Sequence, residues 1–128
     1  MSQLTTKQII PFEAACKKMA LEEGVRFVGI INRQGRLIAG GFKEGVLPYE
    51  SDEKRQMVYM EVMLDLSMRK EFDDTLGAVR SIVSRRDQVT MISIPLGKHL
   101  LLISTEPQIN ENVIITKANE IFRFLGEY

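Results

Sequence analysis

The chain has 128 residues, of which 45% are apolar and 27% are charged, a composition typical of globular rather than disordered proteins. Its 17 basic and 17 acidic side chains cancel, which argues against a dedicated nucleic-acid-binding protein because such proteins must neutralise phosphates. One cysteine excludes an internal disulfide framework, and no apolar run is long enough for a signal peptide or a membrane span. We therefore expect one soluble, cytoplasmic domain that covers residues 1–128.

The first predicted element is a helix from Thr5 or Thr6 to about Glu23. Pro11 fits best in a first turn, so the regular helix is expected to begin near Ile10, and Gly24 is expected to end it. One face of this helix is formed by apolar residues at helical spacing, namely Ile9, Phe12, Cys16, Met19 and Ala20. The single cysteine belongs to that face, and we interpret it as a small core residue rather than a nucleophile.

The next segment predicts a β-hairpin. Val25–Asn32 is rich in β-branched residues and Arg36–Phe42 returns as the second strand, with Gly35 suited to the positive φ of the turn. The first strand is almost continuously apolar, which indicates a central strand covered on both faces. Gly40 and Gly41 indicate a bulge or the close approach of another backbone. They do not predict a phosphate-binding loop, because they lie within a strand rather than before a helix.

A long helix is predicted from Ser51 to Phe72, with Ser51 as its N-terminal cap. It is expected to end near Asp73 and Asp74, and Gly77 prevents it from continuing. One continuous arc around its axis contains, in angular order, Val62, Leu66, Tyr59, Met63, Ser67, Met60, Leu64, Met57 and Met68. The arc spans about 240°, whereas a surface helix needs little more than about 100° to face its own core. Two interpretations are open: a central helix buried within the domain, or a surface for self-association.

Three strands follow the long helix, over Ala78–Gln88, Val89–Gly97 and Lys98–Glu106. The first carries several arginines, which is typical of an edge strand or a subunit boundary. Pro95 is expected to close the ladder on the second strand, because proline has no backbone N–H.

A last helix, capped by Asn110 or Asn112, is predicted to run almost to Tyr128. Its buried stripe is expected to contain Ile114, Ala118, Ile121, Phe122 and Leu125. The element order is therefore helix, two strands, helix, three strands, helix, which predicts an α+β fold.

This order resembles the roadblock/LC7 superfamily, close to the longin and profilin-like folds, over about Ile9 to Phe124. The segments VRFVGIINRQGRLIAGGF, MEVMLDLSMRKEFD and VTMISIPLGKHLLLIS are similar to an archaeal family of roadblock-like proteins of uncharacterised function. The resemblance implies an α/β sandwich with a five-stranded antiparallel sheet in the order 2-1-5-4-3. Two helices would cover one face and the long helix the other. PAS and GAF sensor domains also wrap helices around a five-stranded antiparallel sheet.

The roadblock resemblance further implies a homodimer, or a heterodimer with a paralogue, built from the long helix and the strand after it. Ala78–Arg86 would be the strand at the dimer edge, and the helical part of the interface would be exposed in a single chain and buried in the dimer. The implied interface residues are Tyr59, Val62, Met63 and Leu66 on the helix and Val79, Ser81 and Val83 on the strand.

Residues that could support catalysis are few. His99 is the only histidine and is expected to be a hydrated residue beside a tight turn. No group of cysteines and histidines offers three or four zinc ligands, and the adjacent acidic pairs at helix ends are interpreted as solvated caps. Phosphate-binding, nucleophile-elbow and calcium-loop motifs are absent from the sequence. We therefore expect a protein that is not an enzyme and has no cofactor.

Five cations flank the end of the long helix and the strand after it: Arg69, Lys70, Arg80, Arg85 and Arg86. If the strand runs back alongside the helix, they could share one end of the dimer interface. Either nearby carboxylates neutralise them, or they form a site for an acidic partner or an anionic ligand.

The resemblance implies a non-catalytic dimerising platform, because roadblock proteins bind small Ras-like GTPases or act as scaffolds in larger complexes. The alternative is a PAS- or GAF-like sensor in which some of the seven methionines line a pocket for a small molecule. A nucleic-acid accessory protein that uses the arginines is disfavoured by the zero net charge.

Overall fold

The computed structural model describes residues 6–125. Its principal elements in chain order are α1 (Thr6–Met19), β1 (Val25–Ile31), β2 (Leu37–Phe42), α2 (Asp52–Arg69), β3 (Ile82–Arg85), β4 (Thr90–Leu96), β5 (His99–Thr105) and α4 (Glu111–Phe122). Two short turns of helix, η1 (Lys70–Phe72) and α3 (Asp73–Leu76), extend α2.

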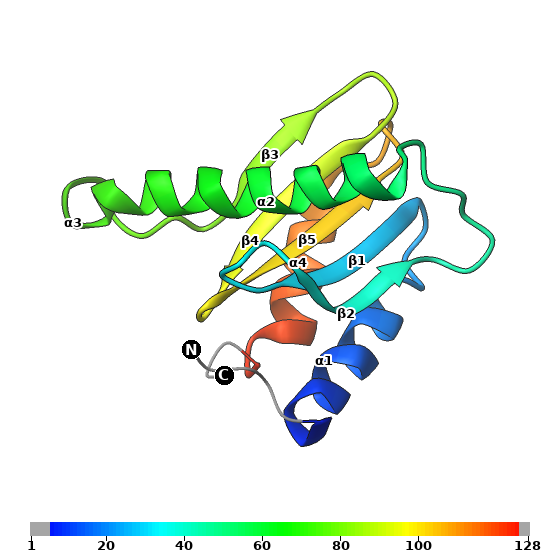
Figure 1. Cartoon of the computed structure of the whole chain (residues 1–128), viewed down its shortest axis with the longest axis horizontal. Coiled ribbons are helices and arrows are strands. Elements are labelled where there is room, and N and C mark those ends of the chain that lie inside the picture. The colour runs from blue at the N-terminus through cyan, green and yellow to red at the C-terminus, as the bar shows by residue number, and fades with distance from the viewer. Residues whose placement is uncertain (1–5, 126–128) are drawn as a thin grey trace.

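The five strands form one antiparallel sheet in the order β2-β1-β5-β4-β3. Helices α1 and α4 cover one face of this sheet, and α2 crosses the other (Figure 1). The predicted α+β fold, its sheet order and its distribution of three main helices are confirmed. Strands β2 and β3 are the two edges, so each has one side without a strand partner in the single chain.

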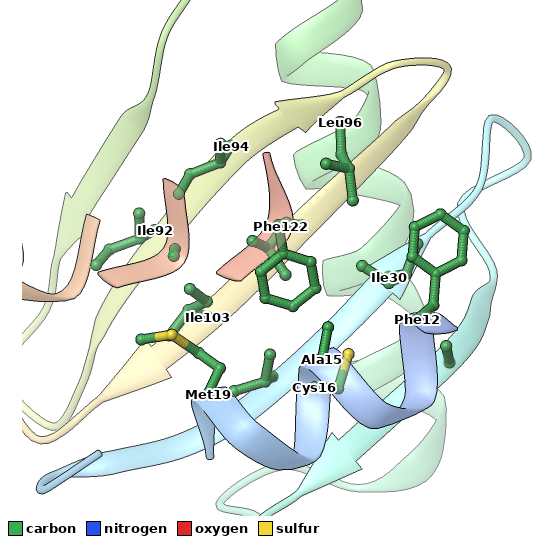
Figure 2. Close-up of a cluster of buried hydrophobic side chains, with 14 of the residues drawn as sticks. Phe12, Ala15, Cys16, Met19, Ile30, Ile92, Ile94, Leu96, Ile103 and Phe122 are labelled. Carbon is green, nitrogen blue, oxygen red and sulfur yellow. The ribbon is translucent and has the colours of Figure 1, made fainter. Parts of the chain in front are cut away.

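The larger core lies between the sheet and the helices α1 and α4 (Figure 2). Phe12, Cys16 and Met19 point from α1 toward the sheet, and Phe122 points toward it from α4. The predicted apolar stripe of α1 is confirmed, and on α4 Ile114, Ala118 and Phe122 are buried. A smaller core lies beneath α2 on the opposite face. Strand β1 is buried along its whole length because both cores cover it.

Local signals in the sequence set several boundaries correctly. The side chain of Asn32 accepts hydrogen bonds from the backbone N–H groups of Gln34 and Arg36, and Gly35 has a φ of 76° in the hairpin turn. Ser51 caps α2 by accepting a hydrogen bond from the N–H of Lys54. Asn110 caps α4 through its own side chain.

Helix α1 has the predicted outer start at Thr6, but its regular part does not wait for Ile10 and its end comes earlier than predicted. The helix already begins at Thr6 and includes Pro11 as its sixth residue, so the proline does not mark its start. It ends at Met19: the N–H of Ala20 makes the last bond to a carbonyl four residues back, and the N–H groups of Leu21 and Glu22 bond three residues back. Gly24 has the predicted positive φ of 80°, but it lies in the turn beyond the helix.

The C-terminal helix is also shorter than predicted. It ends at Phe122 and is followed by a turn, while the last three residues lie outside the described part of the chain. Pro95 does not close the ladder between β4 and β5, because it is paired with Leu100 and β4 continues to Leu96.

Strand β3 has four residues, whereas the sequence predicted a strand from Ala78 to Gln88. Its register pairs Ile82 with Ser93, so the next residues outward would place Arg80 opposite Pro95. Proline has no backbone N–H to donate, which ends the ladder on this side. The segment before β3 is therefore extended chain without regular pairing to β4.

Candidate interaction surface

Helix α2 rests on the sheet through Tyr59, Met63 and Leu66, which are between 2% and 7% exposed. The ring of Tyr59 stacks against that of Phe27 in β1, with 5.8 Å between the ring centroids. These helix residues were predicted to be exposed in a single chain, and that expectation is wrong: they fill the smaller core of their own chain. Val62 is half-buried beside them.

The opposite half of the apolar arc remains uncovered. Met57, Met60, Leu64 and Met68, which we call the outer row of α2, are 56–67% exposed. The row continues past the helix to Phe72 in η1 and Leu76 in α3, which are also exposed. Large apolar side chains gathered along one line are typical of a surface that binds another molecule.

An open groove of about 1220 Å³ runs between α2 and the β3 edge of the sheet. Its helix wall includes Val58, Glu61, Val62, Leu64, Asp65 and Met68, and its sheet wall includes Ile82, Ser84, Met91 and Ser93. The groove therefore joins one flank of the outer row to the unpaired edge of the sheet. A second α-helix laid in it would contact both.

The strand residues predicted for the interface lie along this edge. Val83 is 36% exposed on β3, whereas Val79 and Ser81 are half-buried in the segment that leads into it. Val79 packs against the smaller core. Among residues 6–125 only β4 pairs with β3, so within this part of the chain the outer backbone groups of Ile82–Arg85 have no strand partner.

A small pocket of about 60 Å³ adjoins the groove near the start of α2. Arg26, which is 9% exposed, lies in its wall and forms an ion pair with Glu106, with 3.1 Å between Nη1 and Oε1. The same guanidinium donates to the carbonyl of Leu47 and lies 4.2 Å from the ring centroid of Tyr49. Arg26 thereby fixes the loop before α2 against the sheet.

Arg55 forms the other basic wall of this pocket. It donates to the carbonyl oxygen of Glu50, pairs with the carboxylate of Asp52 and lies over the ring of Phe42. Burial raises the pKa of the Tyr59 hydroxyl, and the nearby Arg55 guanidinium opposes that rise. Both arginines already have carboxylate partners, so they bring little uncompensated positive charge to the pocket.

The five predicted cations do not gather at one end of the helix. Arg69 and Lys70 lie where α2 ends, and the chain then returns along β3 toward the start of α2, where Arg85 and Arg86 lie (Figure 1). Arg80 is in the connecting segment. Arg69 pairs with Asp65 at 3.0 Å, one of the carboxylate partners that the alternative interpretation allowed for. Arg85 pairs with Glu111 at the start of α4.

Cys16 is buried in the larger core, and burial together with the nearby carboxylate of Glu13 raises its pKa to about 12. A thiol in this state is a poor nucleophile, which agrees with the structural role predicted for it. His99 was expected to be hydrated, but it is 7% exposed and its ring lies 5.8 Å from that of Phe12.

No group of three or more potential metal ligands occurs among residues 6–125. Within the same part of the chain, no helix is long and apolar enough to cross a membrane.

Sequence reasoning missed the pocket and the residues that build it. Arg26 carried the only signal, because it is the one charged residue within an otherwise apolar, fully buried strand. A charge in such a strand requires a partner, but the sequence did not indicate that Glu106 and the loop before α2 would supply it. Tyr49 belongs to a connector whose course has no periodic pattern.

The sequence profile of a family of unknown function, DUF6659, matches residues 4–127. This chain belongs to that family. No curated protein matches the DUF6659 chain in sequence.

Solved structures nevertheless share its fold. Gliding protein MglB from Thermus thermophilus superposes with a TM-score of 0.76 at 15% identity, covering 97% of this chain and 94% of MglB. A Roadblock/LC7 domain from Streptomyces avermitilis gives 0.70 at 9% identity, with 91% and 95% covered. An MglB structure described as having a tetrameric arrangement gives 0.72 at 15%, with 99% and 93% covered. The DUF6659 chain therefore has a roadblock/LC7-like fold, as the sequence resemblance implied.

Proposed function

We propose that this DUF6659 protein is a non-catalytic, dimerising platform that binds another protein. The observation that carries the proposal is the groove beside α2, which joins the exposed outer row to the unpaired edge of β3. In the proposed dimer a two-fold axis lies beside β3. The two β3 strands pair antiparallel, and each α2 lies in the groove of the other copy.

Helix contacts and strand pairing both contribute to the stability of this interface. Leu64 and Met68 line the groove and are each 62% exposed, so a dimer would cover four such side chains. At roughly 1.5–3 kcal/mol for each side chain, their burial contributes about 6–12 kcal/mol. Association costs about 4–15 kcal/mol in lost freedom of movement, which is comparable to this gain, and strand pairing would add to the stability of the dimer.

A charge in the helix part of the interface should therefore dissociate the dimer. Leu64→Glu would bury a carboxylate beside Glu61 and Asp65, and we expect it to raise the dimer dissociation constant about a hundredfold or more. Light scattering coupled to size-exclusion chromatography measures the mass of wild type and variant. Because Leu64 is exposed in the single chain, the variant should retain the wild-type circular dichroism spectrum.

Leu21→Glu is the matched control. It makes the same substitution at a leucine that is 78% exposed just beyond α1, on the opposite side of the sheet from the groove, and it should remain dimeric. A wild-type chain that stays monomeric at high concentration would contradict the proposal. So would equal dissociation of both variants.

A small Ras-like GTPase is the partner that the roadblock-like fold suggests. This assignment rests on the resemblance to roadblock proteins, whose fold this chain shares at low sequence identity. The small pocket does not favour the sensor alternative, because its volume of about 60 Å³ is far below the roughly 300–1,000 Å³ of typical ligand pockets.

A further inference from the structure

The chain continues past α2 into a short helical extension that projects beyond the sheet (Figure 1). This extension, residues 70–76, consists of η1 and α3. Phe72 is 59% exposed on it and Leu76 is 79% exposed. Three of its residues are acidic, namely Glu71, Asp73 and Asp74, and Lys70 is its one basic residue. The extension therefore combines two exposed apolar side chains with an excess of negative charge.

The opposite end of the groove offers apolar side chains and two arginines, of which Arg86 has no salt bridge to a described carboxylate. Five residues there line both the groove and the small pocket, namely Tyr49, Glu50, Val58, Val89 and Met91. Arg85 and Arg86 line the groove at the end of β3, together with Asp87 in the turn that follows. Arg86 is exposed and has no salt bridge to a described carboxylate, while Arg85 pairs with Glu111.

A two-fold axis brings these two ends together. Antiparallel α2 helices place the C-terminal end of one beside the N-terminal end of the other, and the 18 residues of α2 span about 27 Å. The extension of one copy then reaches the end of the partner's groove that contains Tyr49, Val58 and Val89. Because a two-fold interface is self-complementary, the same contact forms twice in each dimer.

We propose that the extension of each copy docks onto the Tyr49 end of the groove in a second copy of this chain. Phe72 covers the mouth of the small pocket there, and the carboxylates of Asp73 and Asp74 face Arg85 and Arg86. This inference rests on the proposed dimer and adds to it the relative position of the two helices. It accounts for exposed apolar residues that lie beyond the sheet and cannot contact the core of their own chain.

Cross-linking between two different cysteine variants tests directly whether the extension of one copy lies at the Tyr49 end of the groove in the other. Thr75→Cys places a thiol on the extension, and Gln88→Cys places one in the turn between β3 and β4, at the receiving end of the groove. After the two variants are mixed and allowed to exchange subunits, a short bis-maleimide should join them into a covalent dimer. The native Cys16 does not compete, because it is 3% exposed and its thiol has a pKa of about 12.

The matched control replaces Gln88→Cys by Thr116→Cys, which lies on α4 on the opposite face of the sheet. That mixture should give no covalent dimer, and neither should Thr75→Cys alone, since the two extensions lie at opposite ends of the pair. Absence of the cross-link with Gln88→Cys, in a protein whose wild type is dimeric, would overturn this inference and leave the proposed dimer intact. A monomeric wild type would overturn the proposed dimer itself.

Truncation of the apolar side chain gives a second test. Phe72→Ala removes two contacts from each dimer and should raise the dissociation constant about tenfold or more, measured by analytical ultracentrifugation. Phe124→Ala removes a phenylalanine that is 71% exposed just beyond α4 and should leave the constant unchanged. Both positions are exposed, so neither variant should lose its fold. An equal dissociation constant for Phe72→Ala and wild type would overturn the proposed docking of the extension.

Discussion

The thiol of Cys16 illustrates how a single side chain couples packing to protonation. Burial raises its pKa from 9.0 to about 12, so the folded chain holds this proton more tightly than the unfolded chain does. The contribution of the neutral thiol to stability is therefore fully present below pH 9. It is lost progressively as the pH rises from 9 toward 12.

This titration predicts a specific loss of stability in alkali. Between pH 8.5 and 10.5 the free energy of unfolding of wild type should fall by about 2 kcal/mol more than that of Cys16→Ala, at roughly 1.4 kcal/mol per pH unit. Urea unfolding at several pH values measures both. The Cys16→Ala variant serves as the control for the lysines and tyrosines that titrate in the same window. Parallel curves for the two proteins would contradict the assigned pKa.

At the same scale, the sequence was most informative where a residue acts on its immediate neighbours. Ser51, Asn110 and Gly35 each satisfy or shape the backbone within four residues, so their roles were predictable. Arg26 was not, because its partners are Glu106 and Leu47, which are distant in sequence. Nothing local indicates which distant group will compensate a buried charge.

At the scale of elements, strand β2 approaches both β1 and α1 at Gly40. This glycine has a φ of 82°, and a Cβ atom there would lie 2.1 Å from the carbonyl oxygen of Val28 and 2.9 Å from the sulfur of Cys16. Its N–H also donates to the carboxylate of Glu13 in α1. The close backbone approach predicted from the sequence is confirmed, and it sets the spacing between the hairpin and α1.

Gly40→Ala should therefore disturb this junction. The backbone oxygen of Val28 belongs to a paired strand and cannot move away cheaply, so we expect a loss of roughly 2–4 kcal/mol in the free energy of unfolding. Gly45 is the matched control, because it has a similar φ of 84° and a Cβ atom added there would meet no atom beyond its chain neighbours within 4 Å. Gly45→Ala should cost only about 1 kcal/mol, since strain is its sole penalty. Equal losses in thermal unfolding would show that steric contact is not the cause.

The long helix shows that the sequence does not specify which side of a helix faces the sheet. Its wide apolar arc correctly indicated two apolar surfaces, but periodicity gives angles around an axis and no direction toward the sheet. The Tyr59 side was assigned to a partner, although it is the side that the chain buries against its own sheet. The direction of β3 was likewise open, and it separates Arg69 from Arg85.

At the scale of the whole molecule, pairing across β3 would produce one continuous sheet with two α2 helices side by side on one face. Met57 and Met60, the outer-row residues that do not line the groove, would then remain exposed on both helices, on a surface that crosses the two-fold axis. A partner without two-fold symmetry that binds across this axis would exclude a second copy of itself. The proposed platform should therefore bind one GTPase per dimer.

Met60 allows partner binding to be tested apart from dimer formation. It is 56% exposed on the flank of α2 that touches Gly35 in the β1–β2 turn, which is the flank away from the groove. Met60→Glu should therefore leave the mass of the dimer unchanged while weakening binding of a Ras-like GTPase about tenfold or more. Titration calorimetry with purified GTPases from the same genome, loaded with GDP or a non-hydrolysable GTP analogue, measures affinity and stoichiometry.

Leu64→Glu should abolish the same binding by dissociating the platform, whereas Leu21→Glu should preserve it. If a GTPase bound the monomeric Leu64→Glu variant as tightly as wild type, the dimer would not be the binding unit, and the platform would have to reside in the single chain.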